Sequence, residues 1–132
     1  MPQAEKAPHF PREFRRIRLE LAREPGHPAG DRGFGYVFVA PLDSEDRIDP
    51  ELWKAHRELC RVVRFRPDDE QSIGRLVRRP GGSWAFRYPE DVGEEDEAGV
   101  HFGEEQMRIG EYVSIRDEDE THVYRVTSVE HV

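Results

Sequence analysis

The sequence predicts a mainly β fold, with about seven antiparallel strands in a small bent sheet or partly open barrel and one α-helix over residues 50–60. At the C-terminal end, residues 110–116 and 121–129 are rich in β-branched and aromatic residues, and four consecutive acids at 117–120 separate them. Acids are rare inside strands, so this segment is typical of a hairpin with a solvated turn. The same pattern recurs upstream without the alternating helices that a doubly wound parallel sheet requires.

The first elements follow from composition and spacing. Residues 1–11 contain three prolines and few apolar side chains, so they predict a flexible N-terminal tail, which leaves 12–132 as a single β-rich domain. Apolar residues alternate with charged ones within 14–23, as in a strand that is buried on one face. Residues 34–42 form the most apolar run, which predicts a central strand buried on both faces.

One segment carries the signals of a helix. Asp49 suits the N-cap because its carboxylate accepts a hydrogen bond from a free backbone N–H, and Pro50 suits the first helical position because it has no N–H to lose. Five of the residues that follow, most of them apolar, recur at helical spacing, so 50–60 is expected to be one amphipathic helix. Those residues are Leu52, Trp53, His56, Leu59 and Cys60.

The remaining strands are expected to form hairpins. A Pro-Gly-Gly turn at 80–82 separates two strand-like runs, and its glycines tolerate the positive φ that a tight turn needs. Residues 89–99 include six acids and predict a solvated loop. The predicted strands of this region are 61–66, 73–79 and 83–88, with short ones at 100–102 and 107–109.

Composition limits the class of protein. The chain has 132 residues, a single cysteine and a formal net charge of −8. One cysteine excludes an internal disulfide framework, and no apolar signal region or run of about 20 apolar residues is present, so a soluble cytoplasmic protein without membrane contact is expected. An acidic protein repels phosphate groups, which argues against generic nucleic-acid binding.

Four segments carry a resemblance. Residues 49–57, 79–86, 110–116 and 124–126 resemble those of a family of short, uncharacterised bacterial proteins of unknown function. The likeness covers most of the chain beyond the tail. It implies a free-standing bacterial domain and brings no activity, cofactor or site residue.

A metal or catalytic site at the helix is one hypothesis. His56 and Cys60 are four residues apart, so on a helix both face one way, and imidazole and thiolate are zinc ligands. In the competing interpretation both belong to the core-facing side of the helix, because a free cysteine behaves as a small hydrophobe. No spacing typical of a four-ligand zinc site occurs, and no cofactor is predicted.

Charge segregation is the most substantial functional signal. Residues 57–87 hold eight arginines and four acids, whereas 90–105 hold eight acids and no base. Arginines and aromatic residues alternate around the turn at 80–82, as on surfaces that bind single-stranded nucleic acids. In the competing interpretation the aromatic side chains are core and the arginines form a solvated face. The candidate binding residues are Arg75, Arg78, Arg79, Trp84 and Arg87.

The leading hypothesis is therefore a non-catalytic binding or accessory module that presents this hairpin to an unknown protein or polyanionic ligand, since Arg and Trp are enriched where interfaces concentrate binding energy. The alternative is a small metal-binding protein or enzyme with its site at His56 and Cys60. The lack of a catalytic motif favours the binding module.

Overall fold

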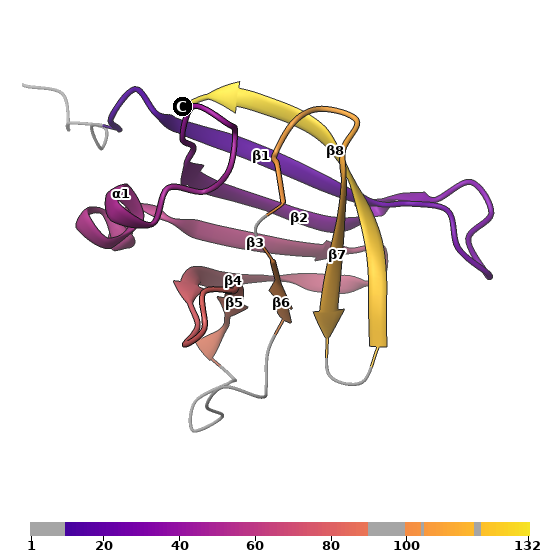
Figure 1. Cartoon of the computed structure of the whole chain (residues 1–132). Helices are drawn as coiled ribbons and strands as arrows, with labels where there is room; N and C mark the ends of the chain where they lie inside the picture. The colour runs from indigo at the N-terminus through magenta and orange to yellow at the C-terminus, as the bar shows by residue number, and fades with distance from the viewer. Residues whose placement is uncertain (1–9, 90–99, 104, 118–119) are drawn as a thin grey trace, which may run out of the picture.

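The computed structural model describes residues 10–89, 100–103, 105–117 and 120–132, which form a curled antiparallel sheet with a short helix at one end (Figure 1). The strands are β1 (Phe14–Leu21), β2 (Asp31–Pro41), β3 (Arg61–Arg66), β4 (Asp69–Arg78), β5 (Trp84–Arg87), β6 (Val100–Phe102), β7 (Tyr112–Asp117) and β8 (Glu120–His131). The helix is α1 (Pro50–Ala55), and the 3-10 turn η1 (Arg57–Leu59) follows it. The prediction of a mainly β, antiparallel fold with one α-helix is confirmed.

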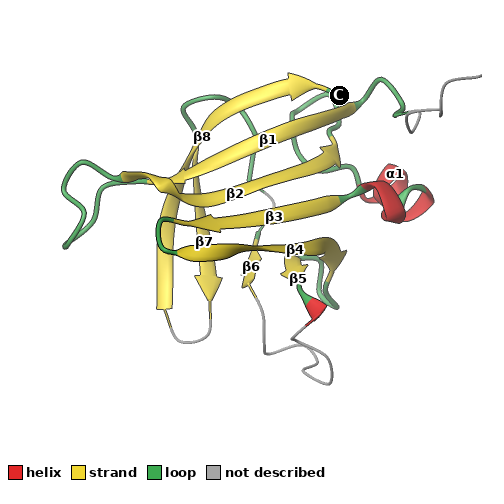
Figure 2. Cartoon of the chain, turned by 180° about the vertical axis from the view of Figure 1, so that it is seen from behind, coloured by secondary structure: helices red, strands yellow, loops and turns green. Residues whose placement is uncertain are grey.

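Each strand pairs with the next one along the chain, and β8 also pairs with β1, so the sheet closes into a barrel. β8 makes this closure possible because it is long and bent: its first half pairs with β7 and its second half pairs with β1 (Figure 2). Closure pairs the two edge strands, which removes the exposed edges that an open sheet would present.

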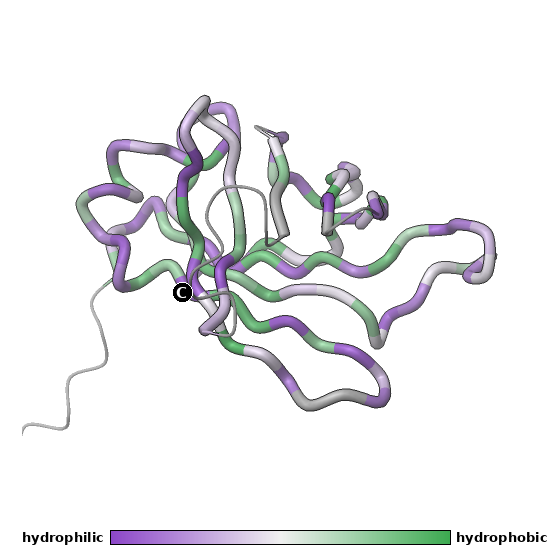
Figure 3. Tube along the Cα trace, turned by 90° about the horizontal axis from the view of Figure 1, so that it is seen from below, coloured by the Kyte–Doolittle hydropathy of each residue, from purple (hydrophilic) through white to green (hydrophobic). Residues whose placement is uncertain are grey.

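Side chains alternate between the barrel interior and the outer surface. In β2, Tyr36, Phe38 and Ala40 are buried, whereas Val37 and Val39 are only partly buried. The prediction that this strand is buried on both faces is therefore wrong, because a barrel strand turns one face toward the interior and the other toward solvent. Figure 3 shows how hydrophobic and hydrophilic positions alternate along the chain.

The helix begins where the sequence predicts but ends early. The Asp49 carboxylate accepts hydrogen bonds from the backbone N–H groups of Glu51 and Leu52 at 2.9 and 3.2 Å. The α-helix stops at Ala55 instead of residue 60, because His56 leaves helical geometry (φ −135°, ψ 41°) and the chain continues as η1. The predicted single amphipathic face is therefore split between two short elements.

A tryptophan of α1 covers one end of the barrel. Trp53 is buried, its indole N–H donates to the backbone oxygen of Leu76 at 2.9 Å, and its ring packs edge-on against Trp84 with centroids 5.4 Å apart. Figure 1 shows α1 at the end where β1 begins and β2 finishes. The helix thus packs against the apolar end of the barrel interior.

Residues 105–111, before β7, form a loop, so the expected short strand at 107–109 is absent from the described residues. Met107 is nevertheless buried, and its backbone N–H donates to the carbonyl of Asp46 at 2.7 Å. The Arg108 guanidinium donates to the carboxylate of the same aspartate at 2.7 Å. Contacts with a distant turn replace strand pairing here. The predicted tail, up to residue 9, and residues 90–99 of the acidic loop lie outside the described residues.

Candidate functional site

The predicted hairpin is present, but its candidate residues do not share a face. β4 and β5 pair around a turn in which Gly81 and Gly82 take positive φ of 95° and 101°. Trp84 is 1% exposed and lies in the core, so a partner cannot reach its ring. Arg78 lies opposite Trp84 and stacks on it, with the guanidinium carbon 5.0 Å from the ring centroid.

Two of the candidate arginines do reach the outer surface. Arg75 and Arg87 lie directly opposite each other on β4 and β5, and Arg61 of β3 lies opposite Arg75 on its other side. All three side chains are exposed, and no described residue forms an ion pair with them. We call these three residues the outer arginine row. Arg79 lies nearer the turn, where its guanidinium donates to the Ser83 hydroxyl at 3.4 Å.

Aliphatic side chains flank the outer arginine row. Val63 and Ile73 are paired on one side of it, and Val77 and Ala85 are paired on the other. Ile73 is 57% exposed, so the surface next to the row is partly apolar. The sequence-based prediction missed Arg61 because this residue lies on β3, and its alignment with β4 is a matter of strand register.

The two candidate metal ligands do not form a shared site. Cys60 is fully buried, and this burial, with the charge of Glu58, raises the pKa of its thiol to about 12. Such a thiol is protonated at neutral pH, which suits neither metal binding nor nucleophilic attack. The thiol donates to the backbone oxygen of His56, whose ring packs edge-on against Phe14. Among the described residues no group of three or more His, Cys, Asp and Glu side chains could hold a metal ion.

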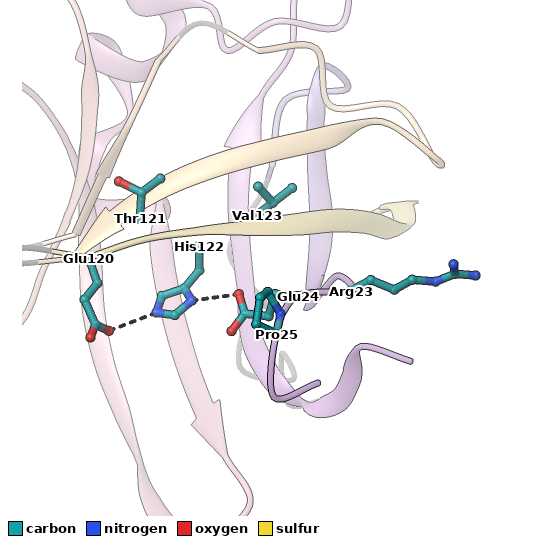
Figure 4. A pocket seen from close by; sticks show the side chains of 7 residues that line it. All are labelled: Arg23, Glu24, Pro25, Glu120, Thr121, His122 and Val123. Carbon is teal, nitrogen blue, oxygen red and sulfur yellow. Dashed lines mark hydrogen bonds and ion pairs between the residues drawn. The ribbon is translucent and has the colours of Figure 1, made fainter. Parts of the chain in front are cut away.

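A surface cleft of about 430 Å³ contains a histidine outside the predicted set (Figure 4). His122 Nδ1 is 2.9 Å from Glu24 Oε1, and its Nε2 is 3.1 Å from Glu120 Oε1. The hydrogen bond with Glu24 is the largest cause that raises the pKa of His122; partial burial opposes it, and Glu120 adds to the rise. The cleft is lined by Arg23, Glu24, Pro25, Glu120, Thr121, His122 and Val123.

The contacts of His122 with Glu24 and Glu120 are typical of structural ion pairs and do not suit a catalytic centre. Both ring nitrogens of His122 can donate to carboxylates only in the imidazolium form, which has no lone pair left for a base or a metal ligand. Arg23 points away from the histidine in Figure 4. Glu24 is 98 residues from His122 in sequence, so only the fold brings the two together. The ion pairs tie the start of β8 to the turn after β1.

Comparisons of the chain with protein-family models, with curated proteins and with solved structures found no match. The resemblance to a family of short bacterial proteins stays a prediction. Across the residues that the structure describes, no helix combines the length and the apolar character needed to cross a membrane.

Proposed function

We propose that this protein is a non-catalytic binding module whose outer arginine row, Arg61, Arg75 and Arg87, binds an acidic segment of a partner protein. The observation that carries the proposal is the alignment of three exposed guanidinium groups across three neighbouring strands, with no acidic partner among the described residues. Arginine suits this role because its planar fork matches a carboxylate group.

The proposed face lacks three residues of the sequence-based one and includes one residue that the sequence-based one did not. Trp84 is excluded from the proposed face because its side chain is buried, and Arg78 is excluded because its guanidinium stacks on that buried ring. Arg79 leaves it because its guanidinium hydrogen-bonds within the turn. Arg61 joins Arg75 because the two are paired across β3 and β4.

Electrostatic repulsion within the row favours a binding role. Like charges directly opposite each other on neighbouring strands destabilise a sheet, by roughly the 0.2–1 kcal/mol that a favourable cross-strand pair contributes. Arg75 has such a neighbour on each side. An acidic partner would offset the repulsion and gain charge-assisted hydrogen bonds. The chain as a whole has a net charge of −8, so this local excess of positive charge is a marked departure from the average surface.

A protein partner fits the face better than a nucleic acid. Nonspecific binders of single strands stack bases on exposed aromatic rings, but the aromatic residues of this hairpin, Trp84 and Phe86, are in the core. The outer neighbours of the row are aliphatic, and Ile73 is largely exposed. An acidic segment with interspersed apolar side chains matches this combination of charge and aliphatic surface.

The test measures the binding of a fluorescein-labelled peptide in which glutamates alternate with leucines. The full chain should bind it, and affinity should fall with added salt because the contact is ionic. The variant Arg61→Gln/Arg75→Gln/Arg87→Gln should bind at least about tenfold more weakly, which is about 1.4 kcal/mol. The matched control, Arg23→Gln/Arg32→Gln/Arg125→Gln, removes the same charge from exposed positions elsewhere and should bind as the unchanged protein does.

Two results would overturn the proposal. Equal binding by the row variant and the unchanged protein would remove the outer arginine row as a site. Tighter binding of a labelled oligothymidylate than of the peptide would replace the protein partner with a nucleic acid. Loss of self-association in the row variant, measured by sedimentation, would identify the acidic partner as a second copy of this chain.

A further inference from the structure

The barrel interior is apolar next to α1 and carries positive charge toward the other end. Next to α1 the inward residues include Phe38 and Val62, which are paired and fully buried. Farther along β3, Arg64 and Arg66 lie on the same inward side, and Arg64 pairs with the fully buried Tyr36 of β2. This is the end where β2 begins and β3 finishes, away from α1 (Figure 1).

Both arginines lie against aromatic rings. The guanidinium carbon of Arg66 is 3.8 Å from the ring centroid of Phe34 and 5.9 Å from that of Tyr36. The guanidinium carbon of Arg64 is 4.9 Å from the ring centroid of Tyr88. Cation–π contact stabilises a guanidinium from its face, but the rings carry no net negative charge. The positive charge of this end of the interior is therefore not neutralised by its aromatic neighbours.

The N–H groups of these arginines still require acceptors, because they lie in the guanidinium plane and not on the stacked face. Arg64 uses one of them, from Nη2 to the Ser72 hydroxyl at 3.1 Å. In Arg66, Nη1 is buried and hydrogen-bonds to no described residue. No described carboxylate lies within ion-pair distance of either arginine. A buried donor without an acceptor destabilises a fold, so the buried Nη1 of Arg66 calls for a functional explanation.

We infer that Arg64 and Arg66 form a binding site for a small organic anion at this end of the barrel. Its carboxylate or phosphate group would accept hydrogen bonds from the accessible N–H groups of the two guanidinium groups, which the rings of Phe34, Tyr36 and Tyr88 hold in place from behind. We call these five residues the barrel-mouth site. Both arginines keep part of their surface exposed, so an anion can reach them from solvent.

The chemistry of the site selects this ligand class. Two arginine forks present paired N–H groups that match carboxylate and phosphate oxygens. The rings fix the positions of the two guanidinium groups, and the mouth of a barrel is a common place for such a ligand. The site is separate from the outer arginine row, since Arg64 and Arg66 belong to the inward face of β3 whereas Arg61 belongs to the outward one.

The test is a titration of the isotope-labelled full chain with benzoate and, separately, with phenyl phosphate, followed by NMR. Either anion should shift the backbone signals of residues 34–36 and 64–66 in a saturable way, and the preferred anion identifies the head group. Benzamide, which has the same ring without the charge, should leave these signals in place. Shifts confined to Arg61, Arg75 and Arg87 would overturn the barrel-mouth site and leave the outer arginine row unaffected. The lack of any shift would also overturn the barrel-mouth site.

Matched variants assign the binding to the site. Arg66→Gln should weaken binding of the preferred anion at least about tenfold, because it removes a charge-assisted contact. Arg18→Gln is the control: that guanidinium also lies over a phenylalanine ring, 4.3 Å from the Phe65 centroid, but it pairs with Glu20. If Arg66→Gln fails to fold, Arg66→Lys keeps the charge without the fork and should bind at least about threefold more weakly. Affinity unchanged in the folded Arg66 variant would overturn the inference.

Discussion

Protonation of His122 should stabilise the fold, and this stabilisation should disappear as the pH rises. His122 hydrogen-bonds to Glu24 at 2.9 Å and to Glu120 at 3.1 Å. These bonds raise the pKa of His122 above its ordinary value of 6.5, so the folded chain holds the proton more tightly than the unfolded chain does. The contribution is therefore fully present below pH 6.5 and is lost as the pH rises through the raised pKa.

The size of the effect follows from the exposure of the two ion pairs. The side chains of His122 and Glu24 are 27% and 22% exposed, so water screens this pair only in part. Glu120 is 76% exposed, and its pair with the histidine adds little. Hydrogen bonds to charged groups contribute about 1.5–3 kcal/mol when well buried and exposed ion pairs about 0–1 kcal/mol, so about 1 kcal/mol is expected in total.

The assay is urea denaturation of the unchanged protein and of His122→Gln at about pH 5.5 and about pH 8.5, at constant ionic strength. The variant should be less stable by about 1 kcal/mol at the lower pH and nearly equal at the higher pH. Glu24→Gln should remove most of this pH-dependent difference, and Glu120→Gln only a few tenths of a kcal/mol. A difference that does not change with pH, or that grows as the pH rises, would refute the reasoning.

Three further predictions concern the core. Gly74→Ala should lower the unfolding free energy, measured by urea denaturation, by more than about 2 kcal/mol, because a Cβ there would lie 2.4 Å from a carbonyl oxygen of β5. The control Gly103→Ala, whose Cβ would lie 3.5 Å from its nearest neighbour, should lower it by well under about 1 kcal/mol. Trp53→Phe should destabilise the fold by about 1–2 kcal/mol, because a buried β4 carbonyl loses its donor at 2.9 Å. The Cys60 thiol is buried and should react with a thiol reagent only after the protein unfolds. Elemental analysis should find no stoichiometric zinc or iron. Rapid labelling of the folded protein, or bound metal, would support the metal-site hypothesis instead.

The strands were predictable because their signals are local. Apolar residues recur at period two in β1 and β8, and the turn glycines stand between β4 and β5. The early end of the helix was not predictable from spacing, since Leu52 and Leu59 fit a helical face but are only partly buried. The burial of Met107 in a loop was missed because its partner is a turn near Asp46, which is distant in sequence.

The candidate sites were harder to predict because they depend on register. A shift of one residue in strand register moves a side chain to the opposite face of the sheet. The register of the hairpin therefore decides whether Arg75 and Trp84 share a face. Strand pairing then brings Arg61 beside Arg75, and barrel closure turns Arg64 inward. The composition shows an excess of arginines over acids in this region. The pairing of three strands is needed to show that the outer arginine row faces outward, whereas Arg64 and Arg66 face the barrel interior.

The most direct test of the binding role is the single substitution Arg75→Glu. It places an acid between Arg61 and Arg87, so cross-strand repulsion becomes attraction. The unfolding free energy should stay the same or rise by up to about 1 kcal/mol, while affinity for the glutamate–leucine peptide should fall at least about tenfold. An unfolding free energy that is lower by more than about 1 kcal/mol, or peptide binding as tight as that of the unchanged protein, would contradict the proposal that the outer arginine row binds a partner.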